Sequence, residues 1–453
     1  MFHEPPKQYL FSGKDLRKLI IPLLIEQFLS VLVGFCDSIM AAFAGEAAIS
    51  GVSLVDVVFV LIINIFTALG SGGAVVAGQY LGAKRDEDGR HTVNQLILFT
   101  ALSGIAVAAL VFILRPFLLD SVFGQITADT REAANTYLLI TAPSIPFIAL
   151  FGSGAALYRA EGNAREPMLV SLGMNLLNIT GNAIMVYVLR MGVVGVAVPT
   201  LLSRMFAGIV MMLLLRDPSN RLCYAQPFRW HIEGALLKKI LYIAIPNSVE
   251  NSVFQLGKIL LLSVVSTLGT AAISANAVSN TIVNLQSLPG IAMQSALLAV
   301  TAQCIGAGDY EQVDYYLKRI IKMTYLYMGI TCVLSVVCID QILSVYNISP
   351  EAAHSVKVII IFIAAAKIIW PLAFVFPNVL RAANDVRFCM LVSAISMWTL
   401  RIGGAIFAVK VLHMGVEATW FAMPLDWIAR LTFFIRRYLS GKWKVYASRN
   451  TDL

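Results

Sequence analysis

The sequence predicts an all-α integral membrane protein in which twelve transmembrane helices form two six-helix lobes. The first observation is composition: 58% of the 453 residues are hydrophobic and only 13% are charged, whereas soluble domains carry about 25% charged residues. The second is a series of apolar stretches of about twenty residues, the length that crosses a bilayer as a helix. The third is a repeat that relates the two halves of the chain.

The apolar stretches fall into two groups of six, separated by a polar segment. The first group lies at about 18–41, 52–80, 92–114, 134–156, 168–189 and 193–215. The second group lies at about 240–265, 274–303, 318–339, 355–377, 389–410 and 415–437. We therefore expect an N-lobe at 1–215, a cytoplasmic linker at 216–239 and a C-lobe at 240–453.

The repeat is visible in three pairs of matching segments. Glu26 follows Pro22 by four residues, and Glu250 follows Pro246 by four, at an offset of 224. Two further pairs match at offsets of 224 and 222: GQYLGA (78–83) with AQCIGA (302–307), and YRAEGNAREPM (158–168) with LRAANDVRFCM (380–390). Because six spans separate equivalent points, both halves share one membrane orientation. This predicts a pseudo-twofold axis along the membrane normal, with a substrate cavity between the halves.

Lysine and arginine are distributed unevenly between the loops of the two sides. One set of loops, together with both termini and the linker, is rich in these residues. The opposite loops carry only five of them: Arg115, Arg131, Arg190, Lys357 and Lys410. Because cytoplasmic loops carry the excess of positive charge, we expect both termini and the linker in the cytoplasm and the protein in the plasma membrane.

Several classes of protein are not expected. The net charge of +8 follows from the loop charges, so it does not indicate a nucleic-acid partner. The chain has no Walker motif and no HExxH motif, so we expect neither an ATPase nor another enzyme, and no cofactor. The six cysteines form no CxxC pair, so we expect no disulfide and no metal cluster.

The first span carries two acids and a proline. Glu26 and Asp37 lie eleven residues apart, close to three helical turns, so both fall on one face, roughly 16 Å apart along the axis. A charge inside hydrocarbon is costly unless it faces a partner or water, so it marks a functional position. Pro22 removes a backbone donor before Glu26 and predicts a hinge. The alternative is that both acids are neutralised in permanent structural pairs.

The fifth and sixth spans add uncharged polar groups. Four residues recur at steps of four, three and four and share one helical face: Ser171, Asn175, Asn178 and Asn182. Their amides could coordinate Na⁺ or accept a hydrogen bond from a protonated acid; the alternative is that they only bond neighbouring helices. Thr200 and Arg204 follow one turn apart in span six. Asp37, Asn182 and Thr200 all lie in the outer half of the N-lobe, so a common site is possible.

The second half has a different set of ionisable residues. Leu261 takes the place that Asp37 holds in the first half, so the two lobes are not expected to share one task. Lys258 lies inside span seven, Glu250 lies near its entrance, and Arg401 lies inside span eleven. These residues, with Glu26, Asn175 and Arg204, are candidates for a cavity or a charge network.

The whole chain resembles an exporter of the multidrug and toxic compound extrusion (MATE) family. The resemblance rests on the twelve spans in parallel halves, on Pro22 with Asp37, and on the two motif pairs of the repeat. It is strongest to the prokaryotic branch related to the DNA-damage-inducible protein F. It implies a monomeric antiporter in the lipid bilayer that exports organic cations or polyaromatic compounds by alternating access, coupled to inward H⁺ or Na⁺.

In that branch the resemblance assigns cation coupling to Asp37, Asn178, Asn182 and Thr200. Asn182 departs from the pattern, because the family usually has an acid there. With only one acid at this site we expect H⁺ rather than Na⁺, which prefers several oxygens including charged ones. A cation site in the C-lobe is not expected, because span ten has no acid.

Two alternatives stay open. A flippase for lipid-linked saccharide precursors, from the same superfamily, is favoured by the cations inside the spans: Arg204, Lys258, Lys367 and Arg401. A receptor or scaffold without transport is disfavoured by the repeat and by the buried acids. Uptake into vesicles under an imposed gradient of H⁺ or Na⁺ discriminates between these functions.

Overall fold

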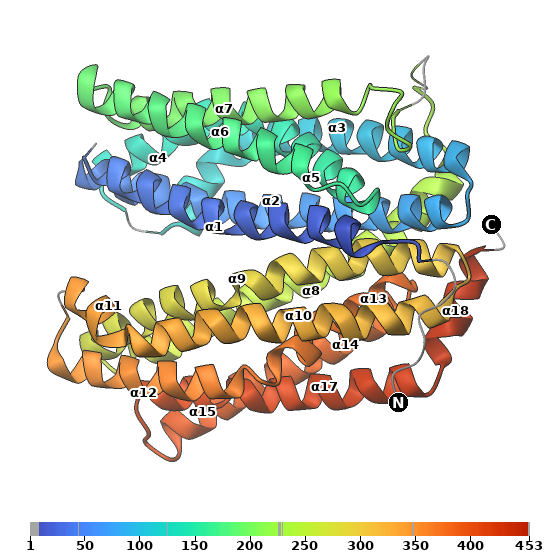
Figure 1. Cartoon of the computed structure of the whole chain (residues 1–453). Coiled ribbons are helices and arrows are strands. Elements are labelled where there is room, and N and C mark those ends of the chain that lie inside the picture. The colour runs from blue at the N-terminus through green and yellow to red at the C-terminus, as the bar shows by residue number, and fades with distance from the viewer. Residues whose placement is uncertain are drawn as a thin grey trace. The chain divides into compact units, whose positions relative to one another are not determined.

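The computed structural model describes residues 9–43, 45–124, 126–224, 228, 230–346 and 348–451. Every regular element in these ranges is a helix (Figure 1), which confirms the all-α fold class. By length and apolar composition, nine helical stretches of the described chain qualify as membrane spans, and a bent pair of helices makes a tenth. The other two of the twelve expected ranges are occupied by α1 (Gly13–Phe43) and by α16 with α17 (Val416–Phe421 and Met423–Leu439).

The chain divides into two units, each held together by its own contacts. The first unit comprises Phe11–Ile245. Its further helices are α2 (Glu46–Gly82), α3 (Asp86–Phe117) with η1 (Leu118–Val122), α4 (Ala128–Thr141), η2 (Ala142–Ser144), α5 (Ile145–Ala160), α6 (Arg165–Asn182) with η3 (Ala183–Val188), and α7 (Gly192–Leu214). Within this unit α2 packs against α3, α4 and α5, and α6 packs between α1 and α7.

The second unit begins at Pro246 and includes Leu10, whose backbone N–H donates to the side chain of Gln312. It starts within α8 (Gly234–Ser266) and continues through α9 (Thr270–Gly306), α10 (Tyr310–Val337), α11 (Ile339–Val345), α12 (Pro350–Ala366), η4 (Pro371–Val375), α13 (Pro377–Ala382), α14 (Val386–Ser396), η5 (Met397–Ile402), α15 (Gly403–Lys410), α16, α17 and α18 (Lys442–Thr451). The central helix is α9, which packs against α10, α12 and α13. Between α12 and α13 the chain bends by 64°, where Pro371 removes a backbone donor.

The boundary between the two compact units falls inside α8, between Ile245 and Pro246. The first turns of α8 pack tightly on α2: a Cβ added at Gly72 would lie 2.7 Å from the carbonyl oxygen of Ile240. Lys239 Nζ also donates to the Tyr80 hydroxyl at 2.9 Å. Arg221, which follows α7, also bonds to the first unit, because its guanidinium pairs with Asp86 at 2.6 Å.

The repeated motifs meet in one ion pair per unit. In the first unit Arg159 Nη2 lies 2.6 and 2.8 Å from the two carboxylate oxygens of Glu26. In the second unit Arg381 Nη2 lies 2.8 and 2.9 Å from the oxygens of Glu250. All four side chains are largely buried. In each half, therefore, the glutamate that follows the proline bonds the arginine of the YRAEGNAREPM motif or of its equivalent, LRAANDVRFCM.

Helix α1 is continuous through Pro22, and the role of this proline as a hinge stays a prediction. At the C-terminal end of α1 the backbone of Asp37 is helical, but its side chain lies outside the described residues.

Cysteine labelling tests the orientation derived from loop charge. His413, between α15 and α16, and Glu87, at the start of α3, both have exposed side chains. In a variant that lacks the six native cysteines, a cysteine at position 413 should react with a membrane-impermeant maleimide in intact cells, and one at position 87 only after permeabilisation. The reverse pattern would contradict the expected orientation, because it would place the basic loops outside.

Candidate functional site

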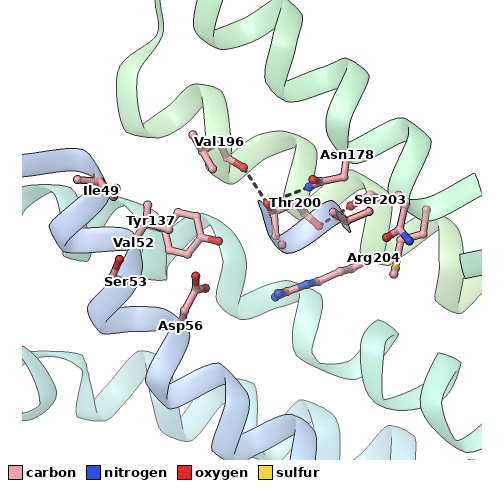
Figure 2. A pocket seen from close by; sticks show the side chains of 14 residues that line it. Ile49, Val52, Ser53, Asp56, Tyr137, Asn178, Val196, Thr200, Ser203 and Arg204 are labelled. Carbon is pink, nitrogen blue, oxygen red and sulfur yellow. Dashed lines mark hydrogen bonds between the residues drawn. The ribbon is translucent and has the colours of Figure 1, made fainter. Parts of the chain in front are cut away.

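A polar cavity of about 300 Å³ lies inside the first unit. Helices α1, α2, α4, α6 and α7 each contribute to its lining (Figure 2). Its polar lining residues are Ser53, Asp56, Tyr137, Asn175, Asn178, Thr200, Ser203 and Arg204. Because polar groups in a membrane helix are costly unless bonded or hydrated, their convergence on one space marks a candidate binding site.

A ladder of side-chain hydrogen bonds joins α6 to α7 at one wall of this cavity. Asn182 Nδ2 donates to Asn178 Oδ1 at 3.1 Å, and Asn178 Nδ2 donates to Thr200 Oγ1 at 3.2 Å. Thr200 Oγ1 donates in turn to the carbonyl oxygen of Val196 at 2.8 Å. Asn182 is fully buried behind the wall, whereas Asn178 and Thr200 line the cavity. Three of the four residues expected to act in coupling therefore form one bonded chain.

Close packing fixes the register of α6 and α7 beside the ladder. A Cβ added at Gly181 would lie 2.7 Å from Pro199 Cβ, closer than side chains normally approach. Gly181 precedes Asn182, and Pro199 precedes Thr200. The absence of a side chain at position 181 thus lets the two helices approach closely enough for the hydrogen bonds to form.

Replacing Gly181 by Ala should lower both stability and transport. The added methyl group forces α6 away from α7, and overpacking of this kind costs about 1–3 kcal/mol. We expect a lower midpoint of thermal unfolding in detergent and slower dye export from cells. Gly152→Ala in α5 is the matched control, because a Cβ there meets nothing within 4 Å. Equal behaviour of the two variants would contradict a role for this close approach.

Among the described side chains the acid that lines the cavity is Asp56 in α2, which is absent from the set of site residues expected from the sequence. Its carboxylate has the Tyr137 hydroxyl as hydrogen-bond partner and lies within the electrostatic influence of Arg204. Figure 2 shows these side chains converging from α2, α4 and α7. The one signal in the sequence was an isolated acid in a long apolar run, and that signal did not say which way the acid faces.

The remaining side-chain bonds of Arg204 hold it at the cavity wall. Arg204 Nη1 donates to Ser144 Oγ at 3.2 Å, and its guanidinium lies 4.7 Å from the centre of the Phe59 ring.

Asp37 follows the lining residues Val33 and Gly34 by one helical turn along α1. Its backbone is therefore adjacent to the cavity, while its side chain lies outside the described residues.

None of the candidate residues of the second unit is among the lining residues of this cavity. Glu250 is engaged with Arg381, and Leu261 is buried in an apolar cluster with Met397 and Ile402. Lys258 and Arg401 both lie over the ring of Phe254, at 5.1 and 5.5 Å from its centre.

Two further observations bear on the chemistry of the chain. Lys367 is buried, and its Nζ donates to the carbonyl oxygen of Val283 and to Ser287 Oγ, both at 2.8 Å. Among the described residues no group of three or more His, Cys, Asp and Glu side chains is placed to hold a metal ion.

A bundle of membrane-crossing helices with a polar cavity inside one of two repeated units is an architecture typical of membrane transporters. The MatE family model matches the chain twice, over residues 22–184 and 246–407. These matches begin at Pro22 and Pro246, the two prolines of the repeat. The chain belongs to the MatE family of transporters and is not an enzyme.

The relatives and solved structures that match cover most of the chain. A probable multidrug resistance protein NorM of Thermotoga maritima is 24% identical over 95% of this chain and 93% of its own length. The multidrug export protein MepA of Staphylococcus haemolyticus is 22% identical, over 83% of this chain and 82% of its own. A MATE crystal structure in complex with MaD3S superposes with a TM-score of 0.88 at 19% identity, covering 96% of this chain and 97% of that one.

Proposed function

We propose that this chain is a secondary active multidrug efflux transporter. It exports organic cations or polyaromatic compounds in exchange for inward H⁺, by alternating access. It acts as a monomer in the plasma membrane, with both termini in the cytoplasm. The observation that supports this proposal best is the polar cavity of the first unit, where an acid, a guanidinium, two amides and four hydroxyl groups converge within a helix bundle.

In the proposed mechanism Asp37 takes up a proton from outside and releases it inside. The ladder of Asn178, Asn182 and Thr200 lies on helices next to α1, so it can exchange partners when the Asp37 carboxyl gains a proton. A neutral Asp37 would lower the affinity of the lobe for a cationic substrate, and loss of the proton would restore that affinity. Bending at Pro22 would couple this change to the opening of the cavity.

The charges around the cavity favour H⁺ over Na⁺ as the coupling ion. Asp56 adds a second acid to the site, but Arg204 stands close enough to offset its charge. Asn182 supplies an amide where a carboxylate would bring a further negative charge. A tightly held Na⁺ prefers several oxygen ligands including charged ones, so a site in which Asn182 replaces an acid suits a proton better.

Transport by purified protein in vesicles tests the proposal. With a fluorescent cationic dye as substrate, an imposed pH gradient without Na⁺ should drive dye movement, and an Na⁺ gradient at equal pH on both sides should not. Transport driven only by an Na⁺ gradient would support the exporter function but contradict H⁺ as the coupling ion. Absence of dye transport under either gradient would contradict the proposed function.

The alternative function is a flippase for lipid-linked saccharide precursors. It is favoured by the cations within the membrane-spanning helices, of which Lys258 carries an exposed side chain and Arg401 is buried. Vesicles that contain a fluorescent polyprenyl-phosphosaccharide discriminate between the two functions, because a flippase would make the label accessible to a quencher added outside. We expect no such movement above that of protein-free vesicles.

A further inference from the structure

The second unit contains two cations beside one aromatic ring with no acid bonded to either. Lys258 Nζ and the Arg401 guanidinium lie 5.1 and 5.5 Å from the centre of the Phe254 ring. Among the described residues no carboxylate forms an ion pair with Lys258 or Arg401. The two positive charges also repel each other electrostatically. Arg401 is buried, and a buried charge without a partner is costly, so this arrangement calls for a negative group.

Most of the free-energy cost of burying an unpaired charge falls on Arg401. Its side chain is 7% exposed, and its Nε–H is buried without a hydrogen-bond acceptor. Among the described residues the acid that acts on it electrostatically is Asp426, whose Oδ1 accepts from Arg430 Nε at 2.8 Å and from Ser396 Oγ at 2.6 Å. The Oδ2 of Asp426 is hydrogen-bonded to no group of the described chain, Arg401 included. Asp426 therefore acts on both Arg401 and Arg430, and Lys258 adds a third cation with no carboxylate partner among the described residues, so a surplus of positive charge remains.

The backbone holds the two cations in a fixed relation. A Cβ added at Gly257, next to Lys258, would lie 2.4 Å from Met397 Cε and 2.9 Å from Ile402 Cδ1. Helix α8 is therefore pressed against η5, the π-helical segment that carries Arg401. Such π-helical turns occur frequently at functional sites, where the extra residue redirects a side chain.

We propose that Lys258 and Arg401 form a binding site for an oxyanion, a carboxylate or a phosphate, carried by an amphipathic ligand. Guanidinium and ammonium groups bind oxyanions through charge-assisted hydrogen bonds. Lys258 is exposed and would meet the ligand first, whereas Arg401 would bind the oxyanion at the buried end. The proposal adds to the exporter function a ligand class, aromatic acids and zwitterions, which a purely cation-selective site would reject.

Binding of a matched pair of probes to the purified full-length chain in a neutral detergent tests this site. Pyrenebutyrate carries an aromatic body and a carboxylate, and pyrenebutanol has the same body without the charge. We expect pyrenebutyrate to bind at least about tenfold more tightly, since hydrogen bonds to charged groups contribute more than neutral ones. Equal affinities of the wild-type chain for the two probes would overturn the proposal. No gradient is involved, so this result is independent of the coupling ion.

Variants identify the residues. Lys258→Met and Arg401→Gln should each reduce pyrenebutyrate affinity to that of pyrenebutanol, while pyrenebutanol binding is kept. Arg319→Gln is the control, because Arg319 also lies over an aromatic ring of this unit, that of Tyr315, and should keep the preference. Lys258 is exposed, so Lys258→Met decides the question even if Arg401→Gln fails to fold. Retention of the preference in Lys258→Met would contradict the site.

Competition distinguishes the sources of the oxyanion. If millimolar inorganic phosphate displaces pyrenebutyrate, the site accepts a free anion. If only bilayer discs with phosphatidylglycerol weaken binding, relative to discs of phosphatidylcholine, the occupant is a lipid headgroup. If neither competes, the site requires the aromatic acid itself. Each of these results is consistent with an oxyanion site at Lys258 and Arg401. If the competition is lost in Lys258→Met, the competing anion binds at Lys258.

Discussion

Replacing Asp37 by Asn should leave the chain folded and able to bind a cationic dye, but unable to export it under any pH gradient. Asparagine resembles the protonated acid in shape, yet it cannot release a proton. If Asp37 is the group that couples proton entry to substrate exit, the exchange cycle then stops with one state permanently favoured. We expect export to fall to the level of cells that carry no transporter.

The measurement is dye efflux from energised cells, with the amount of membrane-inserted protein checked in parallel. Asp56→Asn is the matched control, because it also removes one acid of the same lobe. It should weaken export of a cationic dye but keep the dependence on the pH gradient, since Asp37 is intact. Full export by Asp37→Asn would remove Asp37 from the mechanism.

Replacing Glu250 by Gln should destabilise the second unit strongly. Arg381 bonds both oxygens of Glu250, and the two side chains are only 16% and 12% exposed. Removal of one partner leaves a buried guanidinium without its counter-charge, which costs about 3 kcal/mol or more. We expect a clear drop in the midpoint of thermal unfolding in detergent and a lower yield of inserted protein.

Two comparisons sharpen this experiment. Glu26→Gln breaks the equivalent pair with Arg159 in the first unit and should have an effect of similar size. Asp340→Asn breaks the exposed pair with Lys357 and should change stability little, since exposed ion pairs contribute little. If Glu250→Gln were as stable as Asp340→Asn but lost all cation dependence of transport, Glu250 would belong to coupling rather than to structure.

These pairs show where inference from the sequence stops. The repeat revealed that Glu26 and Glu250 are equivalent, and that the motifs around Arg159 and Arg381 are equivalent too. It did not reveal that Glu26 bonds Arg159 and that Glu250 bonds Arg381, because these partners lie 133 and 131 residues apart in the chain. A structural pair and a functional acid have the same sequence signature until the partner is known.

The cavity gives a second example. The spacing of Asn175, Asn178 and Asn182 predicted one polar face of a helix, because helical periodicity is a local property. The bond from Asn178 to Thr200, and the place of Asp56 opposite Arg204, depend on how α2, α4, α6 and α7 pack. An acid in an apolar run carries no sign of the direction in which it points, so Asp56 could be placed only by the fold.

The sequence by itself determined the class of this protein, the number and order of its spans, the repeat and the family. All of these follow from hydropathy and short motifs, and the transfer free energy of a residue into a bilayer is nearly independent of its distant neighbours. The tertiary structure alone decided which charges are paired, which polar groups share a cavity, and where within α8 one unit ends. Those features depend on contacts between helices far apart in the chain, and only packing brings such helices together.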